Sequence, residues 1–368
     1  MEGGFKSVMH LSYRNFRSIP EELCGPERHN IEEIYLKENL IHRLPDWFFV
    51  RMSHLRFLCL AGNMISSLPD QIDRMVCLET LDLSDNALHG LPPTVGRLQR
   101  LSKLLLNGNY IEQLPLELGQ LQKLEVLEVR KNRLTTIPVQ LAQCIALEDL
   151  QVDDNPRLWS IPTRLFTLPV LSYVSAERCN LFQLPYTINT TTLCFVLLFS
   201  HQQSLTHCPL ALERFAQPDY ESMEQKVKRI RNPPCYRQIR CHAVPYLLNL
   251  PSALVHLCNR HSAAGILPDF LFETALRTCC GRFRWDGLAA LDMPRYCMDR
   301  LINGPVASCS SVPCGREIFT TAVLALVKSK EYAHNFVVSV LFCSKLCADR
   351  WFQYNCDAYE ELSWEVPN

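Results

Sequence analysis

LETLDLSDNAL, residues 78–88, carries the pattern that decides the fold. Its asparagine, Asn86, is followed at intervals of 23 residues by Asn109, Asn132 and Asn155. Around each of the four asparagines the sequence keeps the frame L-x-x-L-x-L-x-x-N, with Val129 and Val152 at the third leucine position of the last two units. A fixed period of this length identifies a structural unit that is repeated along the chain, and such units bury a core only when they stack on one another.

The frame is typical of a leucine-rich repeat, and each part of it has a physical reason. The segment x-L-x-L-x predicts a short strand whose leucines point inward while the alternating positions face solvent. The asparagine amide both donates and accepts hydrogen bonds, so it can satisfy backbone groups of neighbouring coils. The pair that follows, as in Leu91-Pro92, predicts an extended turn on the convex side, because proline fixes φ and has no N–H donor.

Further units extend the array in both directions. Asn39 and Asn63 occupy the asparagine position upstream, in IEEIYLKENLI and LRFLCLAGNMI, and Cys179 occupies it downstream, in LSYVSAERCNL. The outermost units, around residues 9–20 and 193–205, keep the frame only in part, as expected of units that cap the core. The sequence therefore predicts an α/β leucine-rich repeat solenoid of about 7–9 coils with a curved parallel sheet, over residues 1–209.

The rest of the chain predicts two further parts, a linker and helical region at 210–302 and a cysteine-rich α+β region at 303–368. The net charge is −1, so no global field attracts a nucleic acid or a membrane surface. The first residues, MEGGFKSVMHL, contain no apolar signal core, and no apolar run approaches the ~20 residues of a membrane span. We expect a cytoplasmic protein with no nucleic-acid partner and no membrane span.

The outward-facing strand positions predict a binding surface on the concave side of the solenoid. Stacked repeats present an extended concave sheet, and a mixture of aromatic and charged side chains on it is typical of a protein-binding patch. We expect a protein client to contact this face through residues that share this outward position: Tyr35, Phe57, Asp82, Leu105, Glu128, Arg130, Asp149, Asp153 and Tyr173.

Two segments of the middle region match motifs of cullin ligase substrate receptors in part. Leu254 and Cys258 have the spacing of an elongin-binding box, although Ser262 stands at its last aliphatic position. MPRYCMDRL, with Pro294 and Leu301, resembles the cullin-contacting box of the same receptors. The resemblance implies an amphipathic helix that inserts its leucine into a groove of elongin C, and a second contact to a cullin. The alternative is that these residues form the core of a helical domain.

Two cysteine pairs near the end of the chain predict a metal site. Cys309 and Cys314 lie in SCSSVPCGREIF, and Cys343 and Cys347 lie in FCSKLCADRWF. Four thiolates from two such pairs form the ligand set of a structural zinc ion, and the glycine after Cys314 suits a tight turn that points a backbone amide at a sulfur. Buried reduced cysteines are the alternative, because the first pair is more widely spaced than in most zinc motifs.

No catalytic motif occurs. The sequence has no Gly-rich phosphate loop, no G-x-S-x-G and no H-E-x-x-H. His242, His256 and His261 lie near cysteines but have no recognisable orienting partner, so they do not indicate a nucleophilic site. We expect a protein that is not an enzyme.

The repeats resemble the intracellular, Ras-suppressor-like class of leucine-rich repeats, which has 23-residue units and Leu-Pro after the asparagine. LSYRNFRSIPEEL, GRLQRLSKLLLNGN, MPRYC and FCSKLC occur in this order and resemble the family of leucine-rich repeat-containing protein 28. The resemblance implies an intracellular repeat protein with a cysteine-bearing tail. Three functions follow as hypotheses: the substrate receptor of a cullin–elongin ubiquitin ligase, a signalling scaffold of the Ras-pathway type, and a zinc-dependent enzyme.

Overall fold

The computed structural model divides into two compact units. The repeat unit comprises residues 1–158, 168–179 and 190–200, and the second unit comprises residues 159–167, 180–189 and 201–368. The sequence predicted the end of the solenoid at residue 209, whereas two segments of the last coils belong to the second unit. The structure describes residues 7–20, 31–186, 196–199, 205, 208–210, 236–243, 247–251, 256–259, 275–277, 297–298, 300–301, 305–312, 314–330 and 337–366.

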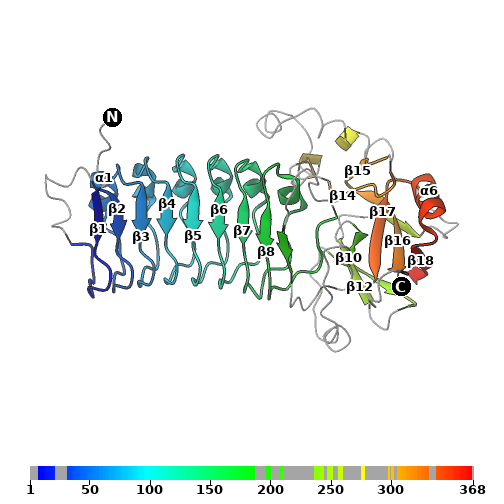
Figure 1. Cartoon of the computed structure of the whole chain (residues 1–368), viewed down its shortest axis with the longest axis horizontal. Helices are drawn as coiled ribbons and strands as arrows, with labels where there is room; N and C mark the ends of the chain where they lie inside the picture. Colours follow the sequence, from blue (N-terminus) through cyan, green and yellow to red (C-terminus); the bar gives the residue numbers. More distant parts are fainter. Residues whose placement is uncertain are drawn as a thin grey trace. The chain divides into compact units, whose positions relative to one another are not determined.

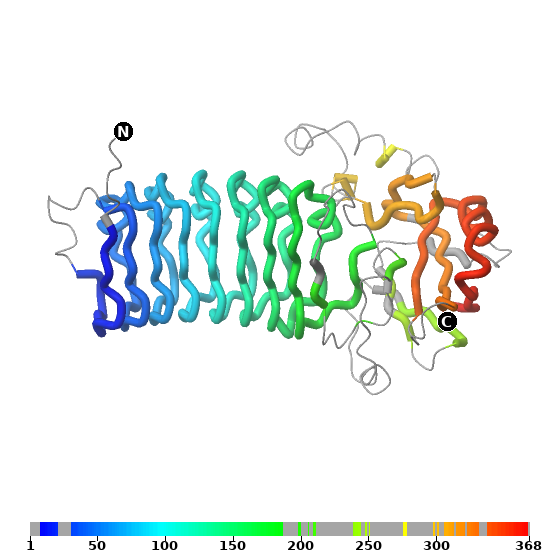
Figure 2. Tube along the Cα trace, viewed as in Figure 1, coloured from blue at the N-terminus to red at the C-terminus, as the bar shows by residue number. Residues whose placement is uncertain are grey.

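The repeat unit is built on one parallel sheet. Figure 1 shows its labelled strands side by side in chain order, and in Figure 2 the chain completes one coil between successive strands. Leu81, Leu104 and Leu127 pair in register at the centres of adjacent strands, and each is fully buried. The predicted solenoid is therefore confirmed. The strands are β1 (Ser7–His10), β2 (Ile31–Tyr35), β3 (Phe57–Cys59), β4 (Thr80–Asp82), β5 (Lys103–Leu105), β6 (Val126–Glu128), β7 (Asp149–Gln151), β8 (Tyr173–Ser175) and β9 (Val196–Leu198).

The repeated asparagines form a buried ladder that joins successive coils. The Oδ1 atom of Asn109 accepts a hydrogen bond from the backbone N–H of Leu88 at 2.9 Å. Its Nδ2 atom donates to the carbonyls of Leu83 at 2.9 Å and Leu106 at 3.0 Å. The carbonyl of Leu106 also accepts from Asn132 at 2.9 Å, so neighbouring asparagines share acceptors. Each side chain thereby satisfies backbone groups that would otherwise be buried without partners.

Cys179 takes the place of an asparagine where only the donor function is needed. In the earlier coils the buried residue two places after each asparagine relies on the next asparagine, as Leu134 N–H does on Asn155 Oδ1 at 3.0 Å. The following coil has one more residue, and the N–H of its buried Leu158 bonds to the carbonyl of Asn155 at 2.9 Å instead. The Cys179 thiol then donates to the carbonyl of Val152 at 3.3 Å, which a weak S–H donor can do.

The convex side consists of short helices, which corrects the prediction of a purely extended turn. Pro92 is extended, with φ −69° and ψ 147°, but the next residues form a 3₁₀ turn closed by Val95 N–H on the Pro92 carbonyl at 3.1 Å. Adjacent turns pack closely, since a Cβ on Gly96 would lie 2.3 Å from the carbonyl oxygen of Glu117. The helices are α1 (Asp46–Arg51), η3 (Asp70–Arg74), η4 (Pro93–Arg97), η5 (Leu116–Gln120), η6 (Val139–Gln143) and η7 (Thr163–Thr167).

The second unit is α+β and is centred on the nine-residue strand β16 (Thr321–Ser329). This strand pairs with β13 (His256–Asn259), β17 (Val338–Phe342) and β18 (Tyr359–Leu362), and β10 (Cys208–Pro209) extends the sheet. Its apolar core is closed by the side chain of Trp364 and one tyrosine of the last coils, Tyr186. The remaining elements are β11 (Tyr236–Cys241), β12 (Leu247–Pro251), β14 (Ala307–Ser308), β15 (Glu317–Ile318), α6 (Lys345–Asn355) and β19 (Trp364–Glu365).

The prediction of a helical region at 210–302 is wrong for three described segments, which are the strands β11, β12 and β13. The apolar spacing in this region suited a helix, but burial between neighbouring strands suits the same residues, and short apolar runs do not distinguish the two. Helical geometry occurs at Cys297, Met298, Arg300 and Leu301. Among the described helices, none combines the length and the apolar character that crossing a membrane requires.

Candidate functional site

Seven of the nine predicted concave residues lie in two adjacent rows across the parallel sheet, whereas Arg130 and Asp153 follow the ends of their strands. Pairing in register continues one row from Tyr35 through Cys59, Asp82, Leu105 and Glu128. The second row runs parallel to it, two positions earlier on each strand, and contains Phe57, Thr80, Lys103, Val126, Asp149 and Tyr173. Alternation in a strand places both rows on the face opposite the buried leucines.

Aromatic side chains stack at the N-terminal end of this surface. The rings of His10 and Tyr35 are 4.8 Å apart and stacked, and those of Tyr35 and Phe57 are 4.7 Å apart. The Tyr35 hydroxyl donates to the Glu33 carboxylate at 3.2 Å, and burial followed by the charge of Glu33 raises the pKa of Tyr35. His10 was not predicted as a surface residue, because its unit lacks the asparagine that sets the frame. The stacked rings give this end a rigid, partly apolar surface.

A carboxylate network occupies the opposite end of the surface. The Asp153 carboxylate is ion-paired with Arg130 at 3.0 Å and accepts hydrogen bonds from the Ser175 hydroxyl and from the Glu177 backbone N–H. Its side chain is only 6% exposed, so both oxygens hold adjacent coils together. The Asp153 carboxylate is therefore buried, whereas its predicted outward position would expose it. One carboxylate oxygen of Asp149 accepts a hydrogen bond from the Gln151 side-chain amide at 2.7 Å, and burial raises the pKa of Asp149.

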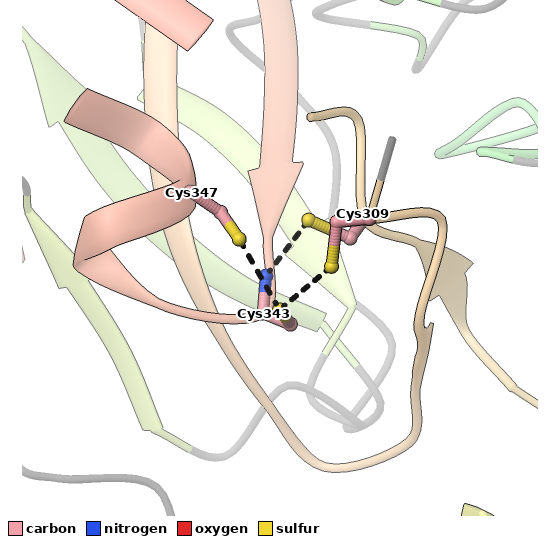
Figure 3. A group of neighbouring side chains, drawn as sticks. Cys309, Cys343 and Cys347 are labelled. Atoms are coloured by element: carbon pink, nitrogen blue, oxygen red, sulfur yellow. Dashed lines mark hydrogen bonds between the residues drawn. The ribbon is translucent and has the colours of Figure 1, made fainter. Parts of the chain in front are cut away.

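The four predicted metal ligands converge in the second unit. All four Sγ atoms, of Cys309, Cys314, Cys343 and Cys347, lie within 4.8 Å of one another. Cys343 Sγ is 3.6 Å from Cys314 Sγ and 3.7 Å from Cys347 Sγ. In Figure 3 the labelled side chains point toward one another, with Cys347 at the start of helix α6. The four-cysteine cluster therefore has the geometry that could hold a metal ion, as the sequence predicted.

The spacing of the sulfurs is compatible with a single tetrahedral metal ion. Four thiolates about 2.3 Å from one tetrahedral metal ion are about 3.8 Å from each other, which is close to the observed separations. A polynuclear iron–sulfur cluster would hold its cysteine sulfurs farther apart, since inorganic sulfide and several irons lie between them. Four cysteine ligands fill a tetrahedral site, so no position stays open for substrate.

Local structure positions each pair of cysteines. The first pair flanks a tight turn in which the N–H groups of Cys314 and Gly315 approach the Ser311 carbonyl at 2.8 and 3.4 Å, and Gly315 has φ +55°. In the second pair, the Ser344 hydroxyl caps helix α6 by accepting from the Cys347 N–H at 3.3 Å. Glycine suits position 315 because a side chain is disfavoured at positive φ, and loss of the Ser344 cap would cost about 1 kcal/mol.

Hydrogen bonding within the cluster separates the protonation of two thiols. The backbone N–H of Cys343 donates to Cys309 Sγ at 3.4 Å. A side-chain hydrogen bond between the two residues lowers the pKa of the Cys309 thiol and, together with burial, raises the pKa of the Cys343 thiol. Burial also raises the pKa of the Cys347 thiol. Convergence of the thiols therefore shifts the pKa values of Cys309 and Cys343 in opposite directions.

Of the four residues predicted to contact elongin C and a cullin, the structure describes Cys258 and Leu301. Cys258 lies in strand β13, where it pairs with Val323, so the helix-in-groove prediction is wrong at this residue. Leu254 and Pro294 fall outside the described residues. Leu301 is helical but only 1% exposed, and its carbonyl accepts a hydrogen bond from Arg164 at 2.8 Å. Leu301 therefore belongs to the interior of the second unit.

Comparison with known proteins agrees with the repeat architecture. A family model described as a leucine-rich repeat region matches residues 47–110. The search of curated proteins gave no match to this chain.

Solved structures with similar folds include a leucine-rich repeat protein of Leptospira interrogans, with 21% identity over 52% of this chain and a TM-score of 0.34. A functional domain of InlJ from Listeria monocytogenes has 18% identity over 50% of this chain and a TM-score of 0.41. The ectodomain of the plant membrane receptor kinase GASSHO1/SCHENGEN3 from Arabidopsis thaliana has 23% identity over 55% of this chain and a TM-score of 0.39. The matches span 66%, 40% and 28% of those chains, respectively, all less than two thirds.

Proposed function

We propose that this chain, whose repeat unit is a leucine-rich repeat solenoid, is a non-enzymatic, cytoplasmic module that holds a protein client on its concave sheet. The observation that carries the proposal is the pair of outward rows, which places Tyr35, Phe57 and Leu105 among charged side chains in strict register. Such rows offer a client apolar contacts flanked by groups that select its charge.

The central strands give the sharpest test. Leu105 and Asp82 are partly exposed neighbours on β5 and β4, and neither belongs to the buried core. Proximity labelling with the intact chain should identify clients, and Leu105→Arg or Asp82→Arg should reduce their labelling by about tenfold or more if these positions are at the centre of the interface. The matched control is Asp70→Arg, an exposed change at the start of η3 on the convex side. Equal loss with the control variant, or no loss with either concave variant, would reject the proposal.

We further propose that the cysteine cluster holds one structural zinc ion. The tetrahedral spacing of the sulfurs supports this, and thiolate ligands select zinc among the common divalent ions. Metal analysis of the purified chain should give one zinc per molecule, with four sulfur ligands by X-ray absorption. Oxygen or nitrogen in the first coordination shell would contradict the assignment of Cys309, Cys314, Cys343 and Cys347 as the complete ligand set.

The narrower family resemblance, to leucine-rich repeat-containing protein 28, is consistent with a client-binding solenoid and a cysteine-bearing tail. A signalling scaffold of the Ras-pathway type would need only the concave face. A ligase receptor would need an elongin-binding helix, and the strand at Cys258 argues against one there. The scaffold is thus the better supported of these two versions.

A further inference from the structure

Exposed apolar side chains gather beside the cysteine cluster. Among the described residues, the four most exposed large apolar or aromatic side chains are Val312 at 85%, Tyr354 at 81%, Tyr13 at 70% and Leu346 at 69%. Three of the four lie in the first cysteine turn or on helix α6. Single exposed apolar residues are common on protein surfaces, but several in one place mark an interaction site.

The spacing along α6 puts two of these residues on one outward face. Leu346, Arg350 and Tyr354 are each four residues apart, so they lie in one row along the helix. The other face of the helix packs into the unit through Ala348, Trp351 and Phe352, and the Trp351 ring is 5.8 Å from Phe342. The side chains of α6 that pack in the core lie on a different face from Leu346 and Tyr354, so these two side chains remain exposed.

The sulfur cluster fixes Val312 relative to this helix. Val312 lies two residues before Cys314, Leu346 lies directly before Cys347, and these two cysteine sulfurs are within 4.8 Å of each other. The turn that carries Val312 and the start of α6 therefore meet at the cluster. Val312, Leu346, Arg350 and Tyr354, together with Arg316 and Lys345, are called here the α6 corner.

The α6 corner carries an excess of basic side chains. Cys309–Arg316 and Cys343–Asn355 contain three basic residues, Arg316, Lys345 and Arg350, against one acidic residue, Asp349. All three basic residues are exposed, and none forms an ion pair within the part of the chain that the structure describes. An unpaired basic rim around apolar side chains complements a partner of the opposite charge.

We propose that the α6 corner is a second docking surface, which binds a protein whose apolar cleft is bordered by carboxylates. A membrane is disfavoured because Val312 and Leu346 offer only about seven side-chain carbons, fewer than a myristoyl chain, which by itself anchors only marginally. A second copy of the chain is disfavoured because a symmetric contact through this corner would bring together two patches that both carry an excess of basic side chains. This surface is separate from the concave sheet, so either can fail without the other.

Photocrosslinking in the full-length chain tests the proposal. Gln353, exposed between Arg350 and Tyr354, can be replaced by p-benzoylphenylalanine, with Lys123 on the solenoid replaced in the same way as the control. The proposal expects a discrete acidic protein that crosslinks at position 353 and not at position 123. No discrete protein at position 353, or the same protein at both positions, would overturn it.

The crosslinked protein, once purified, is then titrated calorimetrically with the zinc-loaded chain. Leu346→Asp should weaken binding by about tenfold or more, as expected of a central apolar anchor. Arg350→Glu should also weaken binding, and the loss of affinity should be larger at low salt than at high salt, because salt screens exposed charges. Val76→Asp is the control, since Val76 is 58% exposed on the repeat unit. If Leu346→Asp loses its zinc, Tyr354→Ser replaces it, because that side chain lies away from the sulfurs along α6. Unchanged affinity in these variants, or binding to phosphatidylserine vesicles that the same variants abolish, would overturn the proposal.

Discussion

Replacing Asn109 by alanine isolates the contribution of one rung of the asparagine ladder. The side chain is 3% exposed, accepts from Leu88 N–H and donates to three carbonyls, those of Leu83, Leu106 and Asn107. Each of these carbonyls has a second donor: Asn86 for Leu83, Asn132 for Leu106 and the Asp85 backbone N–H for Asn107. The substitution therefore leaves one buried group without any partner, the N–H of Leu88.

The expected loss follows from that count. An orphaned buried donor costs about 1–3 kcal/mol, and losing the shared bonds adds about 1 kcal/mol, so Asn109→Ala should lower the free energy of unfolding by about 2–4 kcal/mol. Urea unfolding followed by circular dichroism measures the loss, and amide hydrogen exchange reports the protection of Leu88 itself. Lys123→Ala, at an exposed position of the same coil, should change the stability by less than about 0.5 kcal/mol. If the free energy of unfolding falls by less than about 1 kcal/mol and the Leu88 amide stays protected from exchange, the Leu88 N–H has found another acceptor. The asparagine ladder would then not be required to pair this buried backbone group.

Three further predictions concern the convex turns, the cysteines and one ion pair. Gly96→Ala should lower the melting temperature, because its Cβ would lie 2.3 Å from the Glu117 carbonyl oxygen, whereas Gly90→Ala, with nothing within 4 Å, should not; calorimetry of the pair checks this. Cys314→Ser should abolish stoichiometric metal binding, while Cys356→Ser, an exposed thiol outside the cluster, should retain it, as measured by metal analysis. Arg178→Ala should raise the pKa of Asp154 in an NMR titration, because the hydrogen bond from Arg178 at 2.5 Å lowers that pKa in the native protein. The native pair stabilises the fold at pH values above the usual aspartate pKa, and this stabilisation is lost as the pH falls through the lowered pKa of Asp154.

The repeat unit was predictable because one residue type reports its geometry. Each asparagine fixes the register of its coil, and the strands and their outward rows follow from the period of 23 residues. The first coil was less predictable, because Arg14 stands where an asparagine would mark the frame. The sequence therefore did not predict that His10 stacks on Tyr35. The burial of Asp153 was also missed, since an outward position does not reveal that Ser175 and Arg130 converge on its carboxylate.

The second unit was predictable only where chemistry limits the choice. Four cysteines in two pairs have few structural uses, and the structure brings all four together. The middle region offered apolar spacing alone, which suits a helix or a strand equally over four to eight residues. His256–Asn259 became a strand because β16 offers it a parallel neighbour from 60 or more residues later in the chain, and no local pattern encodes such a partner.

The cysteines of the two units show why position in the fold, rather than abundance, decides their chemistry. In the repeat unit, Cys144 and Cys179 are buried singly, each donates to a backbone carbonyl, and burial raises the pKa of both thiols to about 12. Such thiols stay protonated, so they pack as small apolar groups and bind no metal. In the second unit, Cys309 has a lowered pKa because a neighbouring thiol and a backbone N–H donate to its sulfur. The hydrogen bonds between converging thiols therefore act against burial at Cys309, and a metal ion bound in the cluster would stabilise the thiolate form of all four sulfurs.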